Sequence, residues 1–230
     1  MNDDNLLAAT AGYVDTLSFV SLFGLFTAHV TGNFVLIGAG LAGYGQGIFL
    51  KLMAFPAFVL GVALSSFIIR GRNPDTPMRG ACLLYAVEAL LLLAFCFAGV
   101  NLGHGFHPEN WSVVVCGMIG ATAMGVQNAH SRLVARPGVP NTVMTGNVTQ
   151  VILDVLDLCS TRVTQDVKAA ARRRVGKMLP AIVAFGVGAT VGALAYRAFG
   201  FWALLFAVIA LAWLAMQAWV HRNTVADTVS

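Results

Sequence analysis

The stretch FTAHVTGNFVLIGAG, residues 26–40, raises the question that decides the fold, because a small polar triplet interrupts an otherwise apolar segment. The triplet TGN lies at residues 31–33, and a second TGN lies at residues 145–147 in NTVMTGNVTQVIL. Each triplet leads into a short apolar run, at 33–47 and 143–159. Two copies of one polar signal in apolar surroundings indicate a repeated structural element.

The composition indicates an integral membrane protein. Of the 230 residues, 58% are hydrophobic and 10% are charged, whereas a soluble domain carries about 25% charged residues. The mean hydropathy of +0.77 agrees with this interpretation. Because a spanning helix needs about 20 apolar residues, the chain has room for about eight helices at most. The apolar runs lie at 6–26, 33–47, 52–69, 81–100, 111–131, 143–159, 178–198 and 201–220.

The basic residues indicate which of these runs cross the membrane. If all eight crossed, Lys and Arg would divide almost evenly between the two sides. If the runs at 33–47 and 143–159 each enter and leave by one face, only Lys51 and Arg197 of the 14 basic residues lie outside. Cytoplasmic loops carry an excess of Lys and Arg. We therefore predict an all-α integral membrane protein with six transmembrane helices, two re-entrant half-helices and both termini in the cytoplasm.

The two halves of the chain resemble each other in the order and spacing of their motifs. GYVD at 12–15 corresponds to GVQN at 125–128, and a TGN triplet follows in each half. Three spans per half place the second copy upside down, as in the inverted repeats of many transporters. We predict a 3+3 inverted internal repeat within a single membrane domain, residues 1–230, with halves at 6–100 and 111–221 and a cytoplasmic basic loop at 160–177.

This repeat gives the triplets a physical role. Non-helical backbone is tolerated at membrane depth only inside protein or beside water. Gly32 permits a tight turn, and Thr31 or Asn33 can cap the first amides of the half-helix that follows. Two half-helix N-termini with free N–H groups would then meet near the midplane. Such a place suits an anionic or polar solute.

The paired motifs also carry a family resemblance. The pattern GYVD … TAHVTGN with GVQN … VMTGN resembles the YoaK-like family of bacterial inner-membrane proteins, whose function is unknown. The resemblance covers nearly the whole chain and implies a multi-pass protein of the bacterial inner membrane. It implies no substrate or reaction. The positions that match its motifs are Asp15, Thr31, Gly32, Asn33, Asn128, Thr145, Gly146 and Asn147, with Asn128 standing where the first half has Asp15.

The polar residues inside apolar runs are the candidates for function, because a charge at the bilayer centre costs about 2.5–3.5 kcal/mol. Asp15 is either a proton or cation relay or a substrate contact, or it is a buried carboxyl that is protonated or hydrogen-bonded, for example to Ser18 or to amides of the triplet. Glu88 either couples protons or is a neutral acid bonded between helices. The predicted substrate-binding residues are Asp15, His29, Thr31, Gly32, Asn33, Gln127, Asn128, Thr145, Gly146 and Asn147, and the predicted proton-coupling residues are Asp15 and Glu88.

Several function classes have no support in the sequence. It contains no nucleotide-binding loop, no HExxH and no GxSxG, so we expect no enzyme activity, no cofactor and no metal site. The basic residues follow membrane topology, so we expect membrane lipid and an unknown small solute as partners rather than nucleic acid. A homo-oligomer stays open. The acidic start MNDDNLL is unlike a signal peptide, so we expect the first apolar segment to remain as an anchor.

Two functional hypotheses follow. The first is a small secondary transporter or channel with a midplane site between the two TGN turns. The second is a non-transporting membrane protein, such as an assembly partner or sensor subunit. Pairs of small residues at helical spacing, for example Gly188 and Gly192, support close helix packing in either case.

Overall fold

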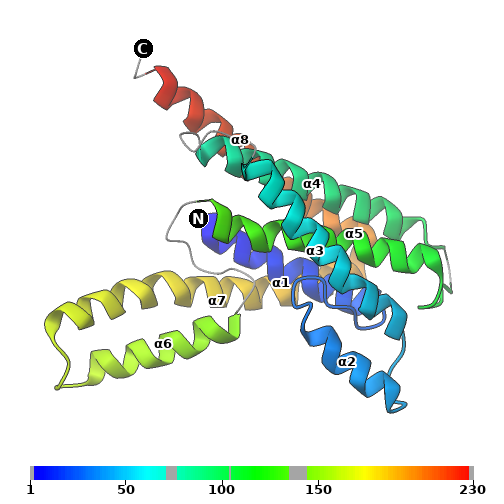
Figure 1. Ribbon diagram of the computed structural model, residues 1–230, viewed down its shortest axis with the longest axis horizontal. Coiled ribbons are helices and arrows are strands. Elements are labelled where there is room, and N and C mark those ends of the chain that lie inside the picture. Colours follow the sequence, from blue (N-terminus) through cyan, green and yellow to red (C-terminus); the bar gives the residue numbers. More distant parts are fainter. Residues whose placement is uncertain (1–2, 71–76, 104, 135–143, 228–230) are drawn as a thin grey trace.

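The computed structural model describes residues 3–70, 77–103, 105–134 and 144–227, and within these ranges every regular element is a helix (Figure 1). The elements are α1 (Asp3–Ser21), α2 (Gly32–Leu41), α3 (Ile48–Arg70), α4 (Pro77–Val100), α5 (Trp111–Leu133), α6 (Met144–Cys159), α7 (Gln165–Phe199), the 3-10 helix η1 (Gly200–Ala203) and α8 (Leu204–Asp227).

Four stretches of the described chain are long and apolar enough to cross a membrane. They are Ile48–Arg70, Gly80–Val100, Trp111–Leu133 and Gln165–Val220, the last of which contains most of both α7 and α8. The prediction of an all-helical membrane protein with several spanning helices is thus confirmed. The count of six spans with two re-entrant segments stays a prediction.

Helices α2 and α6 correspond to the two short apolar runs. Each helix is shorter than the hydrocarbon core of a bilayer is thick. α2 has 10 residues and α6 has 16, which correspond to about 15 Å and 24 Å. The hydrocarbon core of a bilayer measures about 30 Å. The glycine-rich turn between α2 and α3 holds Gly43, Gly45 and Gly47 at positive φ, which reverses the chain directly after α2.

Glycines let two pairs of long helices approach to backbone contact. A Cβ added at Gly188 of α7 would lie 2.0 Å from the carbonyl oxygen of Ala9 in α1. A Cβ added at Gly61 of α3 would lie 2.2 Å from the carbonyl oxygen of Thr122 in α5. Consequently α1 packs along α7 and α3 packs along α5. Each crossing joins the first half of the chain to the second, so the halves interlock.

A third pair of helices, α4 and α8, packs beside this group (Figure 1). The ring of Phe95 in α4 meets that of Phe201 in η1, with 6.0 Å between their centroids. The Tyr13 hydroxyl of α1 donates a hydrogen bond to the Ala203 carbonyl oxygen at 2.7 Å. This bond ties α1 to the start of α8.

The remaining element is a hairpin that extends away from the other helices in Figure 1. We call α6 together with residues 165–180 of α7 the arm. Inside it the Arg174 guanidinium donates to both oxygens of Asp154, with Nε at 3.1 and 3.0 Å and Nη2 at 2.6 Å. The Asp154 side chain is buried, and Gln150 donates to it as well. The Asp154–Arg174 ion pair therefore connects the two helices of the arm.

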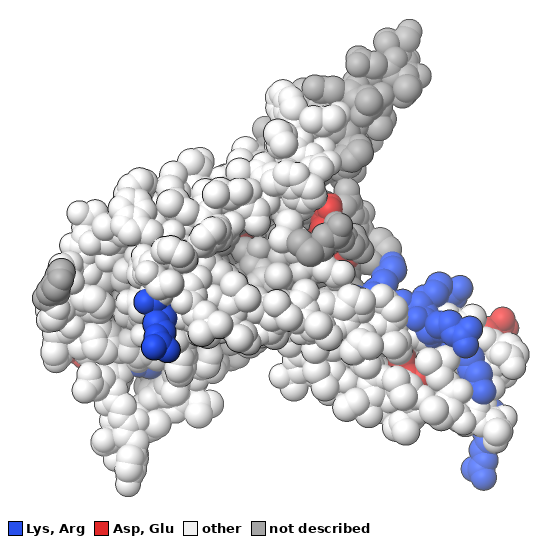
Figure 2. Space-filling view, turned by 180° about the vertical axis from the view of Figure 1, so that it is seen from behind, with Lys and Arg blue, Asp and Glu red and all other residues white. Residues whose placement is uncertain are grey.

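The arm carries five of the 14 basic residues, which gather on one part of the surface in Figure 2: Lys168, Arg172, Arg173, Arg174 and Lys177. The sequence predicts a basic loop at 160–177. In the structure α7 begins at Gln165, so most of that segment is helical. Alanine-rich AAARRR has a high helix propensity, and the pair Asp154–Arg174 anchors this part of α7 against α6.

We expect Gly188→Ala to destabilise the protein, because the new methyl group would overlap the Ala9 carbonyl of α1. Overpacking of this kind costs roughly 1–3 kcal/mol. Gly186→Ala is the matched control, since Gly186 lies on the same helix with no atom within 4 Å of an added Cβ. Thermal unfolding in detergent should show a lower Tm for the first variant only. Equal Tm values for both variants would contradict the proposed tight crossing.

Candidate functional site

The first TGN turn is held in place by the carboxylate of Asp15, which is buried in α1. Its Oδ1 accepts hydrogen bonds from the backbone N–H groups of Thr27 and Ala28 at 2.8 and 2.7 Å. Its Oδ2 lies 2.7 Å from Nδ1 of His29. The Ser18 hydroxyl bonds instead to the Asp15 carbonyl oxygen and to the Thr27 hydroxyl. The loop between α1 and α2, residues 22–31, is thus folded back onto the helix that precedes it.

Asn33 closes the same loop from its other end. Its Oδ1 accepts the Phe26 N–H at 3.0 Å, and its Nδ2 donates to the Phe26 carbonyl at 2.7 Å. The Thr31 side chain makes no capping hydrogen bond. Gly32 does not adopt a positive φ, and its missing side chain leaves room for the Phe26 ring. The predicted tight turn at Gly32 and helix cap from Thr31 or Asn33 are therefore corrected: Asn33 braces the loop.

The expectation of free N–H groups at the start of α2 is also corrected. The N–H groups of Gly32, Asn33 and Phe34 donate to the carbonyl oxygens of residues 29–31 at 2.8, 3.1 and 3.2 Å. These are the short-range bonds that commonly satisfy the first amides of a helix. Asp15 already accepts hydrogen bonds from the backbone N–H groups of Thr27 and Ala28. Polar contacts from this loop to a ligand must therefore come from its side chains.

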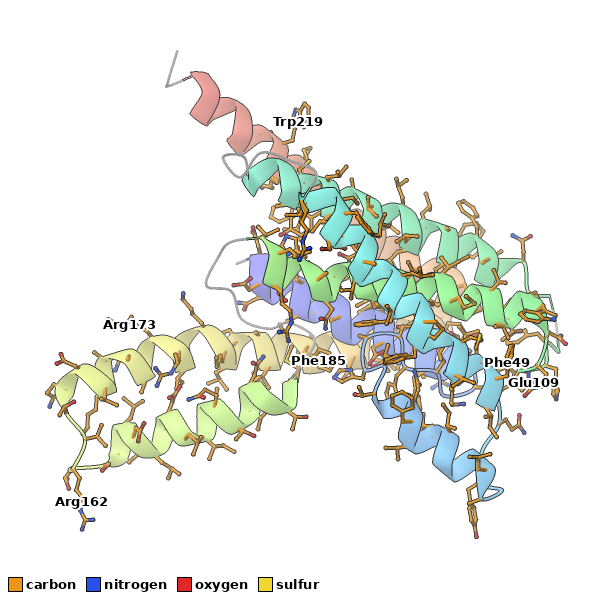
Figure 3. All side chains as sticks on the ribbon, viewed as in Figure 1. Phe49, Glu109, Arg162, Arg173, Phe185 and Trp219 are labelled. Carbon is orange, nitrogen blue, oxygen red and sulfur yellow. The ribbon has the colours of Figure 1, made fainter. Side chains whose placement is uncertain are left out.

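His29 is the titratable side chain of the loop. The hydrogen bond to the Asp15 carboxylate raises the pKa of His29 above its ordinary 6.5, against the lowering effect of burial. About a third of the His29 side chain, 35%, is still exposed. Its ring meets the edge of Phe185 with 5.5 Å between centroids. In Figure 3, Phe185 lies where α7 passes between the arm and the α1–α2 loop.

The loop before α2 and the start of α6, which carries the second TGN triplet, meet at one cavity of about 310 Å³. Four of its lining residues belong to the predicted set: His29 and Thr31 from the first turn, Asn128 from α5, and Thr145 from the start of α6. The others, which sequence reasoning missed, are Ala28, Val30, Phe55, Phe58 and Met144. Apolar residues within apolar runs carry no signal that distinguishes a cavity wall from the core.

The remaining predicted residues of the second half lie beside the cavity or away from it. Gly146 is exposed on α6. Asn147 is buried, and its Nδ2 lies 3.7 Å from the sulfur of Met144. The segment that leads into the second triplet, residues 135–143, lies outside the described residues. Asn147 thus points into the protein at the start of α6, as Asn33 does at the start of α2.

Gln127 of α5 and Glu88 of α4 are both buried. The Gln127 Nε2 donates to the carbonyl oxygen of Leu7 in α1 at 2.7 Å. Neither residue lines the cavity, although Asn128, the neighbour of Gln127, does. The predicted substrate-binding residues Gln127 and Asn128 are therefore separated, because successive residues on a helix point in different directions.

Long apolar helices that interlock through glycine contacts around a partly polar cavity define an all-helical, multi-pass transmembrane protein. The chain belongs to the family described as "Protein of unknown function (DUF1275)", which matches residues 5–217. It is 30% identical over 193 residues to the UPF0700 transmembrane protein YoaK of Bacillus subtilis (strain 168), which covers 83% of this chain and 81% of that protein. No solved structure matches the chain. The resemblance to the YoaK-like family is thus confirmed.

Asp15→Ala should destabilise the protein, because it leaves two buried N–H groups without an acceptor. Each such group costs about 1–3 kcal/mol, so we expect a loss of at least about 2 kcal/mol. Asp15→Asn keeps an oxygen for the same N–H groups and should cost much less. Denaturant unfolding in micelles compares the two variants. Equal losses in both would show that the charge, rather than the acceptor, holds the loop.

Stability should fall as the pH rises through the raised pKa of His29. Protonated His29 is favoured in the folded state, so its contribution is complete below pH 6.5 and is lost above the raised pKa. Thermal scans between about pH 5 and pH 9 measure this slope. His29→Gln should flatten the slope, whereas His107→Gln, at an exposed loop histidine, should preserve it. A slope unchanged in His29→Gln would contradict the assignment.

Proposed function

We propose that this protein moves a small anionic or polar solute across the bacterial inner membrane, as a secondary transporter or channel, through the cavity between its two TGN turns. The observation that supports this proposal is that both TGN segments line the same cavity, with His29 and Thr31 from the loop before α2 and Met144 and Thr145 from the start of α6. Its volume of about 310 Å³ lies at the lower end of the range for small-molecule sites.

The proposed topology has six spanning helices, α1, α3, α4, α5, α7 and α8, and two re-entrant half-helices, α2 and α6. The short lengths of α2 and α6 support it. The basic arm would lie on the cytoplasmic side with both termini, as the orientation rule favours. Loop backbone at membrane depth is acceptable in this arrangement because Asp15 and Asn33 satisfy its polar groups.

The proposed inverted repeat is supported by matched contacts in the two halves. Gly12 opens GYVD, and a Cβ there would lie 2.2 Å from the Phe185 carbonyl oxygen of α7. Gly125 opens GVQN, and a Cβ there would lie 2.4 Å from the Phe58 carbonyl oxygen of α3. Phe58 lines the cavity and Phe185 packs against His29 beside it. The corresponding glycines therefore bring corresponding helices to the same site.

The cavity offers groups that suit a small polar solute or an anion. Thr31 and Thr145 supply hydroxyls, Asn128 supplies an amide, and His29 supplies a ring nitrogen. Asp15 orients His29 through Nδ1, which leaves Nε2 for the solute. Protonation turns Nε2 into a donor, so in our proposal the Asp15–His29 pair couples proton and solute. A carrier of this kind responds to a pH gradient, whereas a passive channel does not.

Thr145→Val should slow solute uptake into proteoliposomes, because it removes one hydroxyl from the cavity wall. Loss of one such hydrogen bond predicts a rate roughly threefold to tenfold lower. The assay screens small organic acids, inorganic anions and neutral polar solutes by counterflow. Thr149→Val is the matched control, since Thr149 lies one turn further along α6, donates to the Thr145 carbonyl and lies outside the cavity lining. Equal rates in both variants would place the solute elsewhere.

The alternative class, an assembly or sensor subunit, receives less support from the helix contacts. Gly188 and Gly192 face the backbone of α1, and Gly117 faces Leu25 and Leu50 of the same chain. These small residues are thus used within the chain rather than left for a partner. Absence of flux for every solute in the screen, together with a stable co-purifying partner, would favour the alternative.

A further inference from the structure

Glu88 and Gln127 carry three buried oxygens that have no hydrogen-bond partner. Glu88 is 1% exposed, and neither of its carboxyl oxygens has a partner. Gln127 is fully buried, and its Oε1 also has none, whereas its Nε2 donates to Leu7. A buried polar group without a hydrogen bond costs several kcal/mol on transfer scales. Both residues therefore leave buried acceptor oxygens unsatisfied.

The register of the two helices places these residues opposite each other. Tyr85 of α4 stacks on His130 of α5, with 4.5 Å between ring centroids. Further along, the Phe95 ring lies against Gly120, whose added Cβ would be 3.0 Å away. The two contacts show that the helices run antiparallel in constant register. Glu88, three residues after Tyr85, then faces the level of Gln127, which lies three residues before His130.

We infer that Glu88 and Gln127 form a proton-binding site, in which the protonated Glu88 carboxyl donates its O–H to Gln127 Oε1. One proton neutralises the carboxylate and also supplies the missing donor. In this state Gln127 accepts from Glu88 and donates to Leu7, so α4, α5 and α1 are joined through a single amide.

Release of the proton to water reverses the role of that amide. A carboxylate accepts hydrogen bonds only, and it would face Gln127 Oε1, which is also an acceptor. The pair is satisfied again when Gln127 turns its amide and donates Nε2 to Glu88. The Leu7 carbonyl then loses its bond from Gln127. The proton on Glu88 thus controls a link between α1, which carries Asp15, and α5, which carries Asn128.

Other titratable groups near this site lie on the helices packed around it. Tyr85 precedes Glu88 by one turn on α4, and His130 follows Gln127 by one turn on α5. Asp3 and Asp4 lie in the first turn of α1, before Leu7. The residues of α8 that are buried towards the core here are apolar: Ala207, Leu211 and Leu214. Among these groups Glu88 is the buried carboxyl without a hydrogen bond.

Infrared spectroscopy of the purified protein in lipid tests the site without any transport assay. We expect a protonated-carboxyl band at neutral pH that disappears in Glu88→Gln and shifts in Gln127→Leu, where the acceptor is lost. Glu109→Gln, at an exposed carboxylate of the outer loop, should leave the band unchanged. A missing band, a band that survives Glu88→Gln, or a band unmoved in Gln127→Leu would overturn the inference. A band that appears only after sodium removal would assign the site to sodium instead.

The link to the cavity rests on the proposed function and has its own readout. Glu88→Gln imitates the protonated state, because its amide N–H can donate to Gln127 Oε1. In the His29→Gln variant, the solute flux should keep the part of its pH dependence that comes from Glu88. We expect Glu88→Gln to keep downhill solute flux but to lose that part of the pH dependence. Unchanged pH dependence would remove Glu88 from coupling while the infrared result stands. Absence of flux in the wild type would count against the proposed function, and the infrared band would still decide the proton site.

Discussion

The cavity depends on the hydrogen bonds of the Asp15 carboxylate, because they satisfy backbone groups of a non-helical loop inside a membrane protein. Backbone N–H groups buried in a protein need hydrogen-bond partners. One carboxylate oxygen receives two of them, from Thr27 and Ala28, and the other positions His29. The cost of burying the charge is offset by these bonds. Asn33 then closes the loop on Phe26, so the entire turn is braced before α2 begins.

The close packing of the two halves connects the loop that Asp15 holds to the long helices. Gly12 and Asp15 lie within one turn of α1, so the helix that approaches α7 most closely is also the one that anchors the loop. Phe185 connects the two, since its carbonyl oxygen faces Gly12 and its ring faces His29. Movement of α7 relative to α1 would therefore shift the Phe185 ring that contacts His29. In our proposal this contact transmits a change in helix packing to the solute site.

The sequence predicts the helical membrane fold, the two short helices and four of the cavity residues, because these follow from hydropathy, length and repeated motifs. It does not predict how the polar side chains are used. Asp15 and Thr27 are twelve residues apart, and only the fold brings the carboxylate to those amides. Asn33 likewise reaches back seven residues to Phe26. The sequence does not predict that residues 165–177 are helical, because a run of Arg residues indicates membrane orientation rather than secondary structure. Phe55 and Phe58 look like any lipid-facing residues until α3 is placed against α5.

The difference between Asp15 and Asn128 determines the charge around the cavity. With His29 neutral, the Asp15–His29 pair carries one negative charge beside the solute, whereas protonation of His29 makes the pair neutral. Asn128 adds no charge from the other side. An anionic solute would therefore bind better when His29 is protonated, and by linkage a bound anion would favour that protonation equally. A second carboxylate at position 128 would leave a negative charge in both states. In our proposal, the asymmetry of the two motifs thus favours proton-coupled entry of an anion over binding of a cation.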